Sequence, residues 1–173
     1  MAETDGNGAA PGAPGQPEAQ AQPQVAIASQ FVRDLSFENL AAQKNMNANV
    51  KPEIKVTVNL DAKPRGDDRY EVVLKLNATS EAEGAPLFIA ELDYAGIFVV
   101  KNVPKEQLHP FLLIECPRQL FPFARRIIAD VTRDGGYPPL MLDMVDFVSI
   151  YRQELERRAA AQQAGGGAPT GTA

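Results

Sequence analysis

The chain has 173 residues, a net charge of −5, one histidine and one cysteine. This length is enough for one domain with a real core, and the negative charge argues against a nucleic-acid-binding protein. One cysteine allows no internal disulfide bond. No apolar run approaches membrane-spanning length, and the N-terminus lacks the pattern of a signal peptide. We therefore expect a cytoplasmic protein that binds no nucleic acid and does not insert directly into a membrane.

The two ends of the chain differ in composition from the rest. Residues 1–24 are mostly Ala, Gly, Pro and Gln with three acidic residues, and residues 163–173 are Gly, Ala, Pro and Thr. Such segments bury too little apolar surface to offset the entropy lost on ordering. We predict a disordered N-terminal tail over 1–24, one domain over 25–162 and a disordered C-terminal tail over 163–173.

Alternation of apolar and polar residues predicts four strands, over residues 25–38, 53–60, 70–79 and 86–100. The polar connection over 39–50 is long enough for a crossover to a non-adjacent strand. Residues 61–68 predict a hairpin loop, and residues 81–84 predict a turn. In the first strand, Phe31, Leu35 and Phe37 are predicted to share one face. Four alternating strands in succession predict an antiparallel sheet with one buried face.

Helical patterns follow the strands. Residues 105–115 predict a short apolar helical piece interrupted by Pro110, and apolar positions from Leu120 to Val131 then recur at helical spacing. Gly135-Gly136 would close this helix, and Asp146 would cap a last one. Strands followed by helices predict an α+β fold.

An apolar stretch without regular structure separates the last two helices. Its sequence is TyrProProLeuMetLeu, residues 137–142, and the two prolines exclude both a helix and a central strand. Because connecting loops are usually polar, this one either packs on the core or binds an apolar partner.

The residue types argue against catalysis. His109 and Cys116 are seven residues apart, a spacing that shares one face of an unbroken helix, but Pro110 interrupts the pattern and no third group is evident to orient them. No Cys/His cluster has metal-ligand spacing, and no glycine-rich phosphate loop occurs. We expect no enzyme, no cofactor and no metal site.

Acidic residues recur on two of the predicted strands. Asp34 and Glu38 share a face of the first strand, and Ile89 and Glu91 share a face of the fourth. If these strands pair, the open face of the sheet carries an acidic patch around one exposed apolar residue. An ordinary solvated sheet face explains the same pattern, and an ordinary packed loop explains the apolar stretch.

Several motifs resemble the SecB protein-export chaperone family. In chain order they are ProGluIleLys (52–55), TyrGluValValLeuLys (70–75), Glu91 with GlyIlePhe (96–98), CysPro (116–117), LeuPheProPheAlaArg (120–125), GlyGlyTyrProProLeu (135–140) and AspPhe (146–147). They cover about Val25 to Gln162. The chain departs from the family at Val50, often an aromatic residue, and at Met144-Val145, where Pro is common.

The resemblance implies a fold, an assembly and a function. The fold is a four-stranded antiparallel sheet with a crossover connection between strands 1 and 2, followed by two main helices packed on one face. The assembly is a homotetramer, built as a dimer of dimers. The function is that of a holdase that binds unfolded precursor proteins, keeps them translocation-competent and delivers them to the SecA ATPase for Sec-dependent export. The alternative is a generic α+β oligomeric interaction protein without chaperone activity.

The same resemblance assigns residues to three surfaces. The SecA-binding surface comprises Asp34, Glu38, Ile89 and Glu91. The groove for unfolded clients comprises Met46, Val50, Ile54, Val56, Tyr137, Leu140, Met141, Leu142 and Phe147. The oligomer interface comprises Phe31, Leu35, Phe37, Leu120, Ala124, Ile127, Ile128 and Val131.

Overall fold

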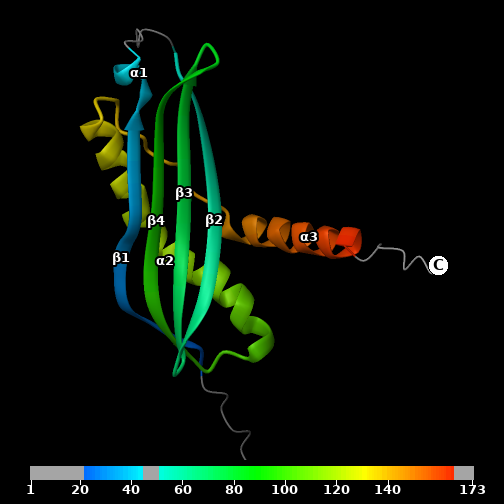
Figure 1. The fold of residues 1–173 in the computed structure, drawn as a ribbon. Coiled ribbons are helices and arrows are strands. Elements are labelled where there is room, and N and C mark those ends of the chain that lie inside the picture. The colour runs from blue at the N-terminus through cyan, green and yellow to red at the C-terminus, as the bar shows by residue number, and fades with distance from the viewer. Residues whose placement is uncertain (1–21, 45–50, 166–173) are drawn as a thin grey trace, which may run out of the picture.

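The computed structural model of the protein describes residues 22–44 and 51–165. Its elements, shown in Figure 1, are β1 (Gln24–Asn39), α1 (Leu40–Gln43), β2 (Glu53–Gly66), β3 (Arg69–Ala82), β4 (Ala85–Lys101), α2 (Lys105–Asp134) and α3 (Phe147–Gly165). The predicted α+β class and the four strands are confirmed. Val50 and Met46, two predicted groove residues, lie outside the described residues.

The four strands form one antiparallel sheet in the order β1-β4-β3-β2. Three consecutive strands are joined by hairpins, and β1 lies beside β4, which is a Greek-key arrangement. The predicted crossover between the first two strands therefore connects the two edges of the sheet, at the left and right of Figure 1. α1 lies in this connection, and the Asn39 side chain caps it by accepting the Ala42 N–H at 2.9 Å.

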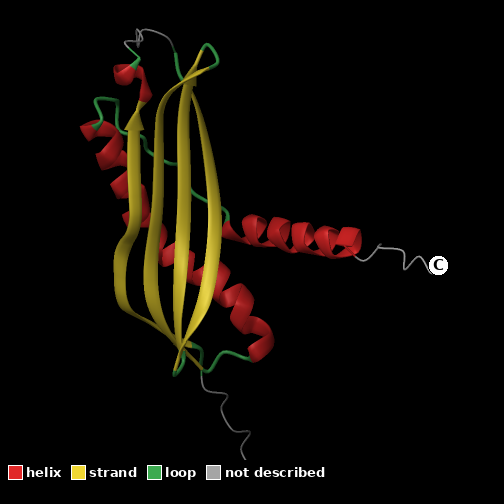
Figure 2. Ribbon diagram, in the orientation of Figure 1, coloured by secondary structure: helices red, strands yellow, loops and turns green. Residues whose placement is uncertain are grey.

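The core lies between the sheet and α2, which crosses behind the sheet in Figure 2. β3 and β4 are buried along most of their lengths, whereas β1 and β2 are mostly exposed. A Cβ atom on Gly96 would lie 2.8 Å from Leu120 Cδ2, so glycine allows the helix to approach β4 closely. One face of the sheet is thus covered by α2, and we call the other the open face.

Three residues predicted at the oligomer interface belong to this core instead. Leu120, Ala124 and Ile128 are each 0% exposed in the single chain, so they have no surface to offer a second copy. Ile127 and Val131 are half-buried and pack against the same core. The predicted helical periodicity is present, but it marks the face of α2 that contacts the protein's own sheet.

α2 is one continuous helix, which corrects the prediction of a separate piece before residue 116. It runs through Pro110, Pro117 and Pro122. A proline inside a helix costs about 3 kcal/mol, whereas burying a leucine-sized side chain contributes about 1.5–3 kcal/mol. Because Leu112 and Leu113 are buried just after Pro110, packing on the sheet offsets the lost hydrogen bond.

Within the described ranges, no helix is long and apolar enough to cross a membrane.

The hairpin between β2 and β3 is tighter than predicted. Both strands extend through most of the expected loop, and only Asp67 and Asp68 form the turn, at φ of 46° and 57°. Aspartate tolerates this left-handed conformation because its short side chain can bond the local backbone. Pro64 is compatible with the longer strand because β2 lies at the edge of the sheet.

A bulge in β1 corrects one predicted face. Leu35 and Phe37 pair with Leu92 and Ala90 on the α2 side, but the register shifts between Val32 and Asp34. Phe31 therefore pairs with Ala95 and lies on the open face. Strict alternation cannot reveal this, because an extra residue in one strand inverts the orientation of all residues beyond it.

Candidate functional site: an apolar groove beside an edge strand

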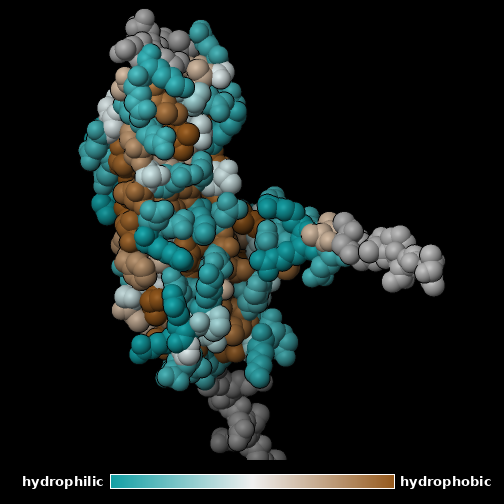
Figure 3. Space-filling view, in the orientation of Figure 1, coloured by the Kyte–Doolittle hydropathy of each residue, from teal (hydrophilic) through white to brown (hydrophobic). Residues whose placement is uncertain are grey.

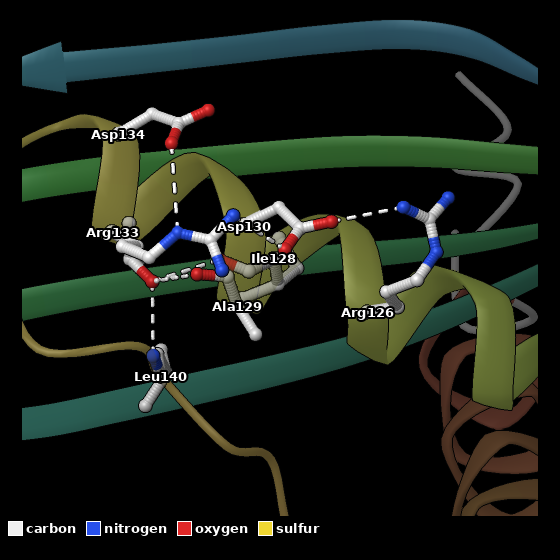
Figure 4. Close-up of polar contacts among 8 residues, drawn as sticks. Arg126, Ile128, Ala129, Asp130, Arg133, Asp134 and Leu140 are labelled. Carbon is white, nitrogen blue, oxygen red and sulfur yellow. Dashed lines mark hydrogen bonds and ion pairs between the residues drawn. The ribbon is translucent and has the colours of Figure 1, made fainter.

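The segment after α2 is held by its backbone. The Thr132 hydroxyl, fully buried, accepts a hydrogen bond from the Leu140 N–H at 2.9 Å and donates within its own helix to the carbonyl of Ile128 at 2.9 Å. The dashed line that ends at Leu140 in Figure 4 marks the first of these bonds. The Tyr137 N–H donates to the Thr132 carbonyl at 3.1 Å. These bonds fix the path of the loop without requiring its apolar side chains to be buried.

The end of β1 supplies a second anchor. The Asn39 Nδ2 donates to the Gly135 carbonyl at 2.9 Å, and the Tyr137 hydroxyl lies 2.9 Å from Asn39 Oδ1 and 3.1 Å from the Leu87 carbonyl. The Tyr137 ring packs on Phe37 and Phe88, with centroids 6.4 and 4.8 Å away. Burial raises the pKa of the Tyr137 phenol above its usual value.

The two glycines that end α2 have different roles. Gly136 has φ of 88°, as a helix stop often does. Gly135 remains helical at φ of −73°, but a Cβ atom there would lie within 2.3 Å of the Phe37 ring. The first glycine therefore makes room for Phe37, and the second turns the chain toward the apolar loop.

Beyond these anchors, the loop and β2 enclose an apolar groove of about 380 Å³. Three alternate residues of β2 form one wall, and the loop forms the other. The lining residues are Ile54, Val56, Val58, Leu140, Met141, Leu142, Asp143, Met144 and Val145. Leu142 is 5% exposed, whereas Ile54 and Val56 are each 43%, Met141 60% and Met144 83% exposed. An apolar surface of this shape suits an apolar ligand.

The structure brings together five of the predicted client-groove residues, namely Ile54, Val56, Leu140, Met141 and Leu142. Tyr137 and Phe147 do not line this groove. Tyr137 packs in the aromatic cluster, and Phe147 is 2% exposed, with its ring centroid 6.0 Å from that of Phe121.

The predicted groove did not include four of its lining residues, namely Val58, Asp143, Met144 and Val145. The alternation of β2 contained the signal for Val58, and the continuing apolar run contained that for Met144 and Val145.

Asp146 was correctly predicted as the N-cap of α3, since its Oδ1 accepts the N–H groups of Val148 and Ser149 at 3.0 and 3.1 Å. Its hydrogen bonds with Ser149 lower the pKa of the Asp146 carboxyl.

The four residues predicted to bind SecA share the open face, which Figure 3 shows as a mixture of polar and apolar side chains. β1 pairs with β4 so that Glu38 lies opposite Ile89, and Asp34 lies opposite Asp93. The Asn77 Nδ2 donates to Glu91 Oε1 at 2.6 Å. Lys75 Nζ lies 3.6 Å from Asp93. In residues 22–44 and 51–165, no basic nitrogen lies within 4.0 Å of the carboxylates of Asp34, Glu38 or Glu91.

At its other end, the open face carries a buried carboxylate between two arginines. Glu71 is 3% exposed, and its carboxylate contacts Arg65 and lies 3.5 Å from Arg33 Nη1. Arg33 comes from β1 and Arg65 from β2, so this carboxylate links the two edge strands across the face. Removing Glu71 would leave two arginines unpaired, which makes it a structural residue.

The reactive residue types do not form a catalytic pair. Burial raises the pKa of the Cys116 thiol to about 12, so the thiol stays protonated. His109 Nδ1 lies 3.0 Å from the Tyr151 hydroxyl and thereby links α2 to α3. α2 continues through Pro110, so the prediction of an interrupted helix between His109 and Cys116 was wrong. No group of three potential metal ligands occurs in the described part of the chain.

The fold is that of a SecB-like chaperone. The structure matches a SecB-like chaperone from Mycobacterium tuberculosis in complex with an antitoxin peptide, with a TM-score of 0.54 and 16% sequence identity, over 70% of this chain and 91% of that one.

The sequence identifies the family. Residues 18–158 match the family model described as preprotein translocase subunit SecB. Protein-export protein SecB from Dinoroseobacter shibae is 58% identical, and that from Ruegeria pomeroyi 56%, each over 95% of this chain and 96% of the relative. The chain belongs to the SecB family, and the protein is a chaperone of protein export.

We predict that Thr132→Val releases the loop, because valine keeps the shape of threonine and removes the acceptor for the Leu140 N–H. The free energy of unfolding should fall by about 1–2 kcal/mol, and hydrogen exchange at the Leu140 amide should accelerate at least tenfold. Thr132→Ser is the matched control, since it keeps the hydroxyl and removes only a methyl group. Equal Leu140 exchange in the valine and serine variants would show that this bond does not hold the loop.

Proposed function

We propose that this SecB-family protein acts in the cytoplasm as a holdase. It binds unfolded precursor proteins in the groove beside β2, keeps them translocation-competent and delivers them to SecA. The observation that supports this proposal is the exposed apolar wall formed by Ile54 and Val56 opposite Met141 and Met144. A groove of this composition would remain solvated and unfavourable without a ligand.

The two walls suit a binder of many sequences. Ile54 and Val56 lie on a hydrogen-bonded strand and have stiff side chains. Met141 and Met144 are unbranched and lie on a loop, so they can repack around different apolar shapes. A rigid wall facing an adaptable one provides affinity without a fixed sequence preference.

The energetics of holding limit the clients to chains that have not yet folded. A holdase present at 100 times its dissociation constant favours the unfolded client by only about 2.7 kcal/mol. Native domains have about 5–15 kcal/mol of stability. The protein therefore captures slowly folding chains and does not unfold native ones.

Assembly would strengthen each weak contact. We propose the homotetramer, with β1 as the edge that meets a second copy. Four residues on the α2 side of β1 remain uncovered, namely Val25, Ile27, Val32 and Leu35, at 37–44% exposure, and Phe123 on α2 is 42% exposed. One long unfolded chain could then occupy several grooves, which raises avidity about 10²–10⁴-fold.

The acidic surface of Asp34, Glu38 and Glu91 around Ile89 suits a basic segment of SecA. Charges on an exposed face mainly increase the association rate, and salt screens them. Delivery to SecA and retention of the client would thus use different surfaces, since the groove lies on the α2 side of β2.

We expect Met141→Asp with Met144→Asp to abolish arrest of a slowly refolding precursor that the wild type arrests. The matched control is Leu155→Asp with Ala159→Asp, two exposed positions on α3, which should arrest refolding as the wild type does. Light scattering should give a tetramer for all three proteins, and a monomeric wild type would contradict the proposed assembly.

The refolding assay also separates the two functional hypotheses. Equal arrest by the methionine variant and the wild type would exclude this groove. If the wild type itself arrested nothing, the holdase would be excluded and the generic interaction protein favoured.

For the acidic surface, we predict that Glu91→Lys weakens SecA binding at low salt, and that adding Asp34→Lys weakens it further. Arrest of client refolding should be unchanged. Glu156→Lys, an exposed reversal on α3, is the control for net charge. Wild-type affinity of the Glu91 and Asp34 double variant for SecA would rule out this docking surface.

A further inference from the structure

We infer that Glu71 is a positioning residue that determines which side chains β1 presents to a second copy of the protein. By holding Arg33 on the open face, it stabilises the bulge in β1 and keeps Val32 on the α2 side. This inference rests on the proposed assembly, because it concerns the strand at which a second copy would pack. Among the described residues, no other charged residue is as buried as Glu71, at 3% exposure.

The carboxylate of Glu71 holds an arginine from each edge of the sheet. Its Oε1 lies 3.5 Å from Arg33 Nη1, and its Oε2 accepts a hydrogen bond from Arg65 Nε at 2.7 Å. The side chains of Arg33 and Arg65 are 44% and 58% exposed, whereas that of Glu71 is 4% exposed. A carboxylate this buried is destabilising unless cations pair with it. The pairing therefore keeps both guanidinium groups on the open face.

Arg33 is the extra residue of the bulge in β1. Val32 pairs with Tyr94. The next pair joins Asp34 to Asp93, so Arg33 has no partner of its own in β4. A bulge of this kind changes the direction of one side chain and bends its strand. Here it directs Arg33 toward the buried carboxylate and inverts the orientation of the residues that precede it.

A regular strand is the alternative to this bulge. Without the extra residue, alternation back from Leu35 would place Arg33 and Phe31 on the α2 side. Phe31 would then lie opposite Gly96, whereas it now pairs with Ala95. The regular strand thus exchanges a valine on the α2 side for a phenylalanine and an arginine.

The ion pair with Glu71 distinguishes these two registers. Burial of apolar surface alone favours the regular strand, since phenylalanine has more apolar surface than valine. The surroundings on the α2 side are aromatic, however, because the rings of Tyr94 and Phe123 stack there with centroids 6.4 Å apart. An arginine in that position would lose the carboxylate and gain an apolar neighbourhood. The charge of Glu71 therefore favours the bulge.

A second irregularity confines the alternative to a short segment. The register of β1 also shifts between Ile27 and Ser29. A movement of residues 29–32 by one position can be absorbed at this second shift, so the pairing on either side is kept. Because a slip of one residue inverts every side chain that moves, only these four residues exchange faces.

The register determines the surface that a second copy meets. In the bulged strand, Val32 and Leu35 lie on the α2 side at 44% and 40% exposure, on the same side as Val25 and Ile27. In the regular strand, Val32 would leave this side and the charged Arg33 would enter it. A desolvated charge without a partner weakens an interface. The buried carboxylate thus favours assembly without belonging to the assembly surface.

The test compares variants of the full-length protein that each weaken this cluster. Arg33→Leu makes the regular strand favourable, because leucine suits the apolar α2 side. Arg65→Leu is the matched control, since it removes the other arginine and leaves the pair between β1 and Glu71. Glu71→Gln removes the charge and keeps the shape. NMR reports the register through the contact between the Val32 methyl groups and the Tyr94 ring, and light scattering on dilution reports assembly.

We expect Glu71→Gln to lose at least half of the Val32–Tyr94 contact. Both copies must be in the bulged form to pack at β1, so the dissociation constant of that interface should then rise at least fourfold. Arg33→Leu should lose as much of the contact, although Glu71 is still paired with Arg65. Arg65→Leu should match the wild type in both measurements.

Full Val32–Tyr94 contact in both Arg33→Leu and Glu71→Gln would overturn the inference. Equal loss in Arg65→Leu would also overturn it, because the effect would then be a general one of unbalancing the carboxylate. A wild type that stays monomeric would instead contradict the proposed assembly, while the NMR contact would still show whether Glu71 fixes the register. The two failures are therefore distinguishable.

Discussion

A single helix covers a sheet that is too wide for it, and the exposed surfaces of this protein follow from that mismatch. An α-helix with its side chains is about 10–12 Å wide, and neighbouring strands lie about 4.8 Å apart, so one helix covers about two strands. β3 and β4 are those strands, and their α2-facing side chains form the core. The apolar residues of the edge strands, such as Val32 and Val56, remain 43–44% exposed. Each edge thus needs a further partner, which we propose to be a second copy at β1 and a client at β2.

Hydrogen bonds at the end of α2 keep the β2 side open. The loop could close over β2 and bury its own methionines if only apolar contacts guided it. Instead, Thr132 and Asn39 fix its backbone at Leu140 and Gly135, and Asp146 begins α3 immediately after it. α3 then leaves the sheet beyond β2 and projects away from it (Figure 1). The groove is therefore maintained by polar bonds at its ends, while its apolar middle stays available.

The sequence predicts the repeating parts of this structure well. Period-two and helical patterns located the four strands and both main helices, because burial of one face imposes those periods. The bulge at Arg33 and the continuity of α2 through Pro110 were missed, since each depends on contacts distant in the chain. The same limit applies to Leu120 and Ile128, whose periodicity shows that one face is buried but not whether its own sheet or a second chain buries it.

Part of the candidate groove could also be predicted from the sequence. Met141 and Ile54 stood out as apolar residues in an unusual loop and on an alternating strand, and the resemblance to SecB placed them in one groove. The roles of Tyr137 and Phe147 could not be predicted in this way, because an aromatic residue beside a groove and one beneath it have the same local pattern. Position 135 requires glycine because a Cβ atom there would meet the ring of Phe37, which lies almost one hundred positions earlier in the chain.

Hydrogen exchange of the intact protein, with and without an equimolar unfolded precursor, shows whether the client occupies the groove between β2 and the apolar loop. We expect slower exchange of the backbone amides in residues 53–58 and 140–145 when the precursor is bound, with unchanged exchange in residues 34–38 of the acidic surface. Protection confined to residues 34–38 and β4, with none in the groove, would contradict it.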